Sequence, residues 1–126
     1  MKVYNPSSVH TAPTYNHGVE VPPNARWLYI SGQVGIDVDG KTGATFARQA
    51  ELAWSNLLAI LAAGGMGVGD LVKVTIYLTR AEDIAESRAV RQRVLGDTRP
   101  ASTLVVIPRL AAPEYLIEVE AHAAKA

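Results

Sequence analysis

The chain has 126 residues, and its twelve basic and twelve acidic side chains give a formal net charge of zero at pH 7. Nucleic-acid-binding domains usually carry a basic surplus, and none is present here. The chain has no cysteine, which excludes disulfide bonds, thiolate nucleophiles and cysteine zinc sites. Hydrophobic residues make up 48% of the chain and charged residues 19%, so we expect one globular domain over residues 1–126.

The N-terminal region is expected to be an irregular arm followed by a strand. Residues 5–25 hold four of the seven prolines, with one short strand expected near 19–21. Alternation over 28–36 then predicts a half-buried strand, which the turn residues 37–40 end. The side chains expected to face the core are Leu28, Ile30, Val34 and Ile36, and those expected on the other face are Tyr29, Ser31 and Gln33.

The clearest helix in the sequence runs from Thr45 to Ala63. Its apolar side chains recur at helical spacing, while Arg48 and Glu51 lie on the opposite side. Gly64 follows as a helix-ending residue. The apolar stripe consists of Phe46, Ala50, Ala53, Trp54, Leu57, Leu58 and Leu61.

The second half of the chain adds a strand, a helix and two more strands. Residues 72–79 alternate with their hydrophobic members facing the core. Thr79 and Glu82 have the spacing of a capping box, which predicts a helix over 82–95 with a thin apolar face. Strands are expected near 103–107 and 115–122. This order predicts an α+β fold in which two helices cover one face of a mixed sheet.

The other face of the predicted sheet is polar. A small sheet with one uncovered face tends to find a partner, so we expect this face to line the interior of an oligomer rather than to be fully solvated. The residues expected on it are Ser31, Gln33, Thr75, Tyr77, Glu118, Glu120 and His122.

Several short segments, in this order and spacing, resemble the RidA (YjgF) family, whose members hydrolyse reactive imines and enamines. The resemblance covers nearly the whole chain. Its segments are Ala12-Pro13 with Tyr15, Tyr29 to Gln33, Gln49 to Leu61, Gly69 to Thr75, Arg99-Pro100-Ala101, Arg109-Leu110 and Ile117 to Ala121. It implies a chorismate-mutase-like subunit in a homotrimer, with small-molecule clefts between subunits.

The resemblance also implies roles for individual residues. Tyr15 matches a cleft tyrosine, Ser31 and Gly32 match a segment of the cleft wall, and Glu118 matches a glutamate that positions or activates water. His17 stands where a glutamine is common, which indicates a different ligand. Ser102 and Thr103 are candidate hydroxyl donors to that ligand.

Ser102 departs from the family pattern, because an arginine grips the substrate carboxylate at this position in the deaminases. A serine hydroxyl cannot replace the two parallel hydrogen bonds of a guanidinium, and losing them would cost roughly 2–5 kcal/mol of binding. This favours a ligand other than an α-imino carboxylate. Arg99 and Arg109 flank the position and are candidates to supply the missing charge, although Arg109 also has a structural interpretation.

Glu118 and Glu120 lie two residues apart on a strand, so their carboxylates point to the same side about 6.6 Å apart. They are either an acid/base pair or two solvated or ion-paired glutamates. His122 shares their face and is either a proton shuttle or an end-of-strand histidine. The three histidines have no metal-binding spacing, so we expect no metal site.

Two other patterns favour structural roles. The glycines of residues 64–69 follow a helix rather than precede one, so they form a turn and not a phosphate loop. Arg88, Arg91 and Arg93 on the second predicted helix are most simply a solvated face.

The leading hypothesis is a trimeric imine or enamine hydrolase that uses Glu118 and needs no cofactor. The alternative is a non-catalytic small-molecule-binding or regulatory trimer, which Ser102 favours. Ribonuclease activity is a third hypothesis, and the neutral charge argues against it. The start of the chain lacks the apolar core of a signal peptide, and no apolar run approaches the roughly 20 residues that span a bilayer. We therefore expect a cytoplasmic protein without membrane or nucleic-acid partners.

Overall fold

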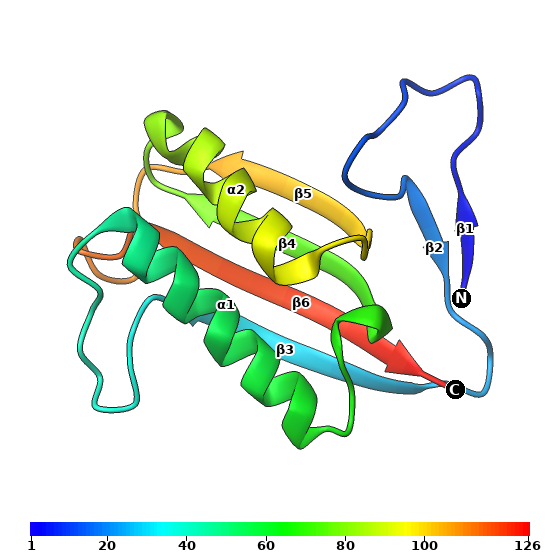
Figure 1. The fold of residues 1–126 in the computed structure, drawn as a ribbon, viewed down its shortest axis with the longest axis horizontal. Coiled ribbons are helices and arrows are strands. Elements are labelled where there is room, and N and C mark those ends of the chain that lie inside the picture. The colour runs from blue at the N-terminus through cyan, green and yellow to red at the C-terminus, as the bar shows by residue number, and fades with distance from the viewer.

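The computed structural model describes residues 1–126 and places two helices on one face of a four-stranded sheet (Figure 1). The strand order is β3–β6–β4–β5. Strand β6 is antiparallel to both of its neighbours, whereas β4 and β5 are parallel. The predicted α+β fold with a mixed sheet is therefore confirmed. The strands are β3 (Arg26–Val34), β4 (Leu71–Leu78), β5 (Ala101–Val106) and β6 (Ile117–Lys125).

The long helix α1 (Phe46–Ala63) forms as its sequence predicts. The Thr45 hydroxyl accepts a hydrogen bond from the Arg48 N–H at 3.2 Å and caps the N-terminus. At the other end Gly65 has a φ of +71°, which glycine adopts without strain, and the Met66 N–H returns to the Leu61 carbonyl.

The second helix, α2 (Ile84–Leu95), follows a short 3-10 turn, Ala81–Asp83. The predicted capping box of Thr79 and Glu82 is wrong. The turn is held instead by the Arg80 guanidinium, which donates to the Asp83 carboxylate at 2.7 Å.

The N-terminal arm forms a separate two-stranded sheet, β1 (Lys2–Tyr4) with β2 (Gly18–Glu20), which lies apart from the main sheet (Figure 1). The strand expected near 19–21 is therefore present, and its partner β1 was not anticipated. The Asn16 backbone N–H donates to the Pro100 carbonyl and the Asn16 amide to the Arg99 carbonyl. These two hydrogen bonds hold the part of the arm around Asn16 beside the start of β5.

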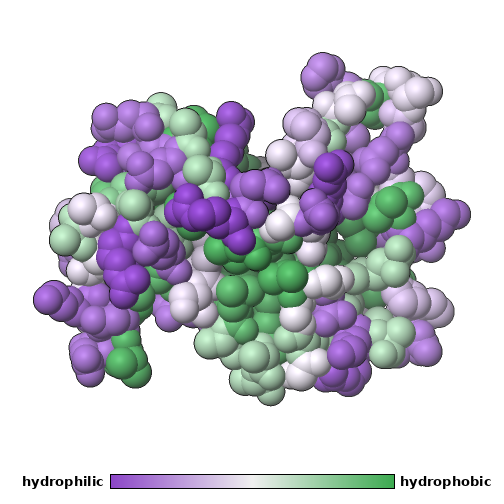
Figure 2. All heavy atoms as spheres, in the orientation of Figure 1, coloured by the Kyte–Doolittle hydropathy of each residue, from purple (hydrophilic) through white to green (hydrophobic).

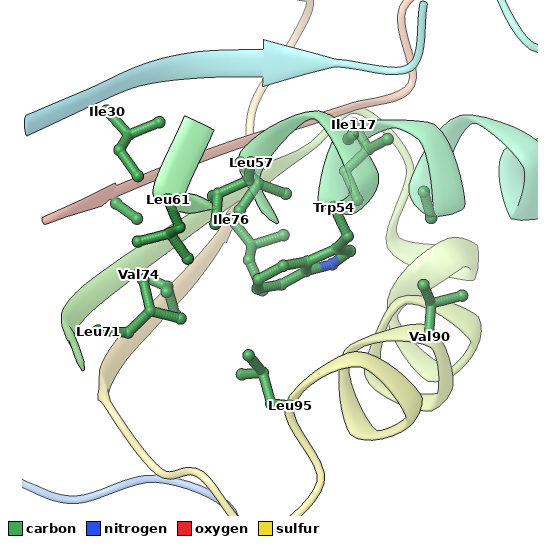
Figure 3. Close-up of a cluster of buried hydrophobic side chains, with 14 of the residues drawn as sticks. Ile30, Trp54, Leu57, Leu61, Leu71, Val74, Ile76, Val90, Leu95 and Ile117 are labelled. Carbon is green, nitrogen blue, oxygen red and sulfur yellow. The ribbon is translucent and has the colours of Figure 1, made fainter. Parts of the chain in front are cut away.

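The core lies between the helices and the sheet. Trp54 and Leu57 of α1, Val90 of α2 and Ile76 of β4 converge there and are almost completely buried (Figure 3). Burying each such side chain contributes about 1.5–3 kcal/mol. The alternation predicted for β4 is confirmed, because Val74, Ile76 and Leu78 are buried while the residues between them are half-buried.

Strand β3 departs from the predicted alternation. Its register with β6 shifts between Ile30 and Gln33, so Gln33 pairs with Val119 on the covered face and Val34 pairs with Glu118 on the other. The alternation in the sequence predicted the reverse, with Val34 facing the core and Gln33 facing away from it. The irregularity is a β-bulge, which inserts one extra residue and reverses the alternation beyond it.

A buried amide joins α1 to two loops. The Gln49 side chain, 3% exposed, donates to the carbonyls of Gly43 and Glu114 and accepts from the Leu116 N–H at 2.9 Å. Gly35 lies close enough to α1 that a Cβ there would be 2.4 Å from the Gln49 Cα. These contacts fix the entry of the chain into β6.

We predict that Gln49→Leu lowers the free energy of unfolding by about 2 kcal/mol, because it leaves three backbone groups without their partners and removes a buried amide that joins α1 to two loops. Urea denaturation measures the change. Gln92→Leu is the control, since Gln92 is an exposed glutamine on α2. Equal effects of the two substitutions would contradict this role for Gln49.

Candidate functional site

The face of the sheet that neither helix covers, called the open face below, carries a row of polar side chains. Cross-strand pairing puts Tyr77 beside Glu118, Thr75 beside Glu120 and His122 beside Tyr29. The predicted composition of this face is therefore confirmed, except for Gln33. Its polar side chains include Lys73, Thr75, Tyr77, Thr103, Glu118, Glu120 and His122.

Glu118 lies across the bulge of β3. A Cβ on Gly32 would be 1.7 Å from Oε2 of Glu118 and 2.5 Å from its Cδ. Only glycine therefore lets the carboxylate occupy this position. Ser31, the other residue of the predicted wall segment, is exposed beside it. The structure thus brings Glu118, Gly32 and Ser31 together on one side of the sheet.

The two carboxylates of β6 have different surroundings. Burial raises the pKa of Glu118, and the negative charge of Glu120 raises it further. Glu120 accepts a hydrogen bond from the Tyr77 hydroxyl, and this bond is the main reason that the pKa of Tyr77 is raised. No side chain donates a hydrogen bond to the Glu118 carboxyl, in contrast to that of Glu120.

Thr103 and His122 lie on the same open face, nearer its rim. The Lys73 ammonium donates to the Thr103 hydroxyl at 2.6 Å. The His122 ring packs edge-on against the Tyr29 ring, with 4.9 Å between the ring centroids. Both side chains are therefore partnered within the subunit.

Ser102 faces the opposite way. It pairs with Val74, which is fully buried, so its side chain points to the helix-covered side of β5. A pocket of about 640 Å³ opens there between β5, α2 and residues 10–15 of the arm, and we call it the arm pocket. Tyr15 lines it, while Thr103 does not. Figure 2 views this side of the molecule, where hydrophilic atoms gather over α2 and the arm.

The wall that α2 contributes to the arm pocket contains two buried polar side chains. Arg91 is 8% exposed and Ser87 is 0% exposed. Neither Nε of Arg91 nor Oγ of Ser87 has a hydrogen-bond partner. Burial lowers the pKa of Arg91. The other arginine on the wall, Arg88, is exposed.

The expectation of a solvated arginine face is therefore confirmed for Arg88 and Arg93 and is wrong for Arg91. The signal was present in the sequence. Ser87 and Arg91 lie three and seven residues after Ile84, which is the spacing of the helix face that packs inward.

The remaining candidates lie elsewhere. His17 lines a second pocket of about 240 Å³ together with Arg99, and its Nε2 lies 2.6 Å from the His10 carbonyl oxygen. Arg109 lines neither pocket, because its guanidinium donates to the carbonyls of Leu110 and Ala111. One subunit therefore places Glu118 and Gly32 on one side of the sheet, and Tyr15 and Ser102 on the other.

Two properties of the whole chain complete the description. No three histidine, aspartate or glutamate side chains lie together in an arrangement suited to a metal ion. Neither helix combines the length and hydropathy that crossing a membrane requires.

Comparison with known proteins gives consistent results. The family model described as Endoribonuclease L-PSP matches residues 6–125. A 2-iminobutanoate/2-iminopropanoate deaminase of Salmonella typhimurium is 37% identical over 117 residues, which are 88% of this chain and 87% of that protein.

Solved structures share the fold over almost the full length. A conserved Rid family protein, YyfB of Yersinia pestis, superposes with a TM-score of 0.87 at 27% identity and covers 98% of both chains. TdcF of Escherichia coli with bound serine has a TM-score of 0.76 at 28% identity and covers 92% of this chain and 91% of its own.

We predict that Gly32→Ala displaces the Glu118 side chain into solvent, because the new Cβ would overlap the carboxylate. The pKa of Glu118 should then fall toward the ordinary glutamate value, which a carboxyl ¹³C NMR titration measures. Gly67→Ala is the control, since a Cβ there meets no atom within 4 Å. An unchanged Glu118 titration in Gly32→Ala would contradict the geometry.

Proposed function

Because the chain belongs to the Endoribonuclease L-PSP family, which includes the RidA proteins, we propose that it is a homotrimeric hydrolase of small imines or enamines. The observation that carries the proposal is the Glu118 carboxyl. It lies against the Gly32 backbone, lacks a side-chain donor and has a raised pKa. A carboxylate whose pKa is raised is a stronger base than an ordinary glutamate, which suits general acid–base catalysis.

The proposed reaction moves only water and protons. Glu118 accepts a proton from water while the water oxygen attacks the C=N carbon, and the imine nitrogen takes up a proton from solvent. In the carbinolamine that results, Glu118 returns its proton to the nitrogen and the C–N bond breaks. The hydroxyl group releases its proton to solvent as the C=O bond forms, so the products are a carbonyl compound and ammonia. Backbone groups near Ser31 and the Thr103 hydroxyl would orient the substrate. These steps require no metal or organic cofactor.

The split between the two sides of the sheet supports a cleft shared by two subunits. Tyr15 and Ser102 of one subunit would face Glu118 and Gly32 of its neighbour. Exposed hydrophobic side chains on the open face favour burial of that face in an assembly. Tyr29 is 70% exposed, Trp27 is 47% exposed and Val105 is 38% exposed.

The alternative is a trimer that binds a small metabolite without catalysis. Ser102 favours it, because this side chain cannot grip a carboxylate as an arginine does. The related TdcF structure contains bound serine, so this fold accepts a small ligand. The alternative predicts ligand binding with no ammonia release.

We predict that the protein releases ammonia from a panel of imines and enamines generated in the assay, and that Glu118→Gln slows this release by about 10²–10⁴-fold. Coupled detection of ammonia measures the rates. Glu114→Gln is the control, because Glu114 is exposed on a loop. Absence of release from every substrate, or release that Glu118→Gln leaves unchanged, would refute the hydrolase.

We also predict that sedimentation equilibrium gives three times the 13.5 kDa mass of one chain. Val105→Asp should shift the protein toward monomers, because it places a charge on the open face. Val38→Asp should not, since Val38 is 99% exposed on a loop. A wild-type monomer at micromolar concentration would exclude the shared cleft.

A further inference from the structure

We propose that the arm pocket binds a small carboxylate, with Arg91 of α2 as its anchor and the hydroxyls of Ser87 and Ser102 beside it. As the substrate subsite of the hydrolase this assignment rests on the proposed function, whereas as an anion site it is tested by binding alone. The missing arginine at position 102 favoured a ligand without a carboxylate. In the structure, Arg91 of α2 supplies a guanidinium to the same pocket that Ser102 of β5 lines.

Arg91 is a buried cation without a counter-ion. No acidic side chain lines the arm pocket, and Arg91 forms no ion pair. Its two Nη atoms donate to Thr14, to the hydroxyl at 3.4 Å and to the carbonyl at 3.2 Å. Two of its five N–H groups are thereby used, and Nε–H is left unpaired. Keeping such a charge buried costs free energy that an anionic ligand would recover.

The unpaired Nε–H determines how a ligand would bind. A carboxylate pairs with guanidinium through two parallel hydrogen bonds, one of which can use Nε–H. Ser87 lies one helical turn before Arg91, so its unpaired hydroxyl is available to the same group. Ser102 approaches from β5.

Buried polar atoms without partners are rare in this protein, and they concentrate here. Three such side-chain atoms exist, and two of them belong to Arg91 and Ser87. The third is Nε1 of Trp54, which lies in the hydrophobic core and not on the pocket wall (Figure 3). Native proteins pair such atoms almost without exception, so two unpaired polar atoms on one wall of the pocket support a ligand-binding role for that wall.

The rest of the pocket limits the size and charge of that ligand. Ile76, Ile84 and Leu104 provide an apolar surface next to the polar wall. One buried guanidinium matches one negative charge, as a carboxylate carries, better than the two charges of a phosphate. The volume of about 640 Å³ lies within the range of small-molecule sites. A short-chain carboxylate fits this combination.

The first test titrates the protein with 2-oxobutanoate, 2-oxobutanamide and inorganic phosphate, and follows binding by NMR chemical shifts. We expect binding of 2-oxobutanoate and little of its neutral amide. Arg91→Met should weaken 2-oxobutanoate at least about 30-fold, and Arg91→Lys should weaken it less. Arg93→Met is the control, because Arg93 lies on the same helix with its side chain 62% exposed.

Thermal unfolding without ligand separates a binding role from a structural one. If Arg91 serves a ligand, Arg91→Met removes an uncompensated buried charge, and Tm should stay the same or rise. If Arg91 serves mainly to hold Thr14, Tm should fall. Added 2-oxobutanoate should raise the Tm of the wild type and of Arg93→Met, but not that of Arg91→Met.

Moving the arginine from position 91 to position 102 tests whether the ligand binds in the pocket that both positions line. In the Arg91→Met background, Ser102→Arg should restore 2-oxobutanoate binding, because both positions line one pocket. Unchanged binding in Arg91→Met, equal binding of the neutral amide, a preference for phosphate, or no recovery in the double variant would each overturn the assignment. None of these readouts requires hydrolysis, so failure here is distinguishable from absence of the proposed activity.

Discussion

The apolar stripe of α1 packs against the strands β3 and β6, and Trp54, Leu57 and Leu61 lose all exposure to solvent there. This contact commits one face of the sheet to the core and leaves the other face uncovered. Alternation along each strand then decides the side on which every functional group lies. Glu118 and Glu120 project to the open face, while Ser102 projects toward α2. One chain therefore carries two groups of candidate residues on opposite sides of the sheet, which are the two half-sites of the proposed shared cleft.

Each half-site depends on a local departure from regular structure. On the open face, the bulge of β3 and the absence of a side chain at Gly32 give the Glu118 carboxylate its place. On the covered side, the guanidinium of Arg91 lies on the inward face of α2, at a position where an apolar residue would normally complete the core. Such departures are costly to stability, and they are expected where function requires them.

Hydrophobic periodicity was enough to predict the sheet, both helices and most of the open face, because these elements pack by simple alternation or helical spacing. The faces of Gln33 and Val34 could not be predicted, since a bulge leaves no mark in residue type alone. The capping of α2 failed because the Arg80–Asp83 ion pair replaced the expected capping box. Arg91 was expected to be solvated because arginine is charged. Its spacing from Ile84 and Ser87 nevertheless puts it on the helix face that packs inward.

The central claim is that a ligand anchored at Arg91 of one subunit meets Glu118 of another. Mixed trimers test it directly: Arg91→Met and Glu118→Gln chains are produced separately, then unfolded and refolded together in equal amounts. Random assembly should leave about a quarter of the clefts with both groups intact, so ammonia release by the mixture should exceed that of either parent, each of which lacks one group in every cleft. If both groups act within one subunit, the mixture stays as inactive as its parents, and the account is contradicted.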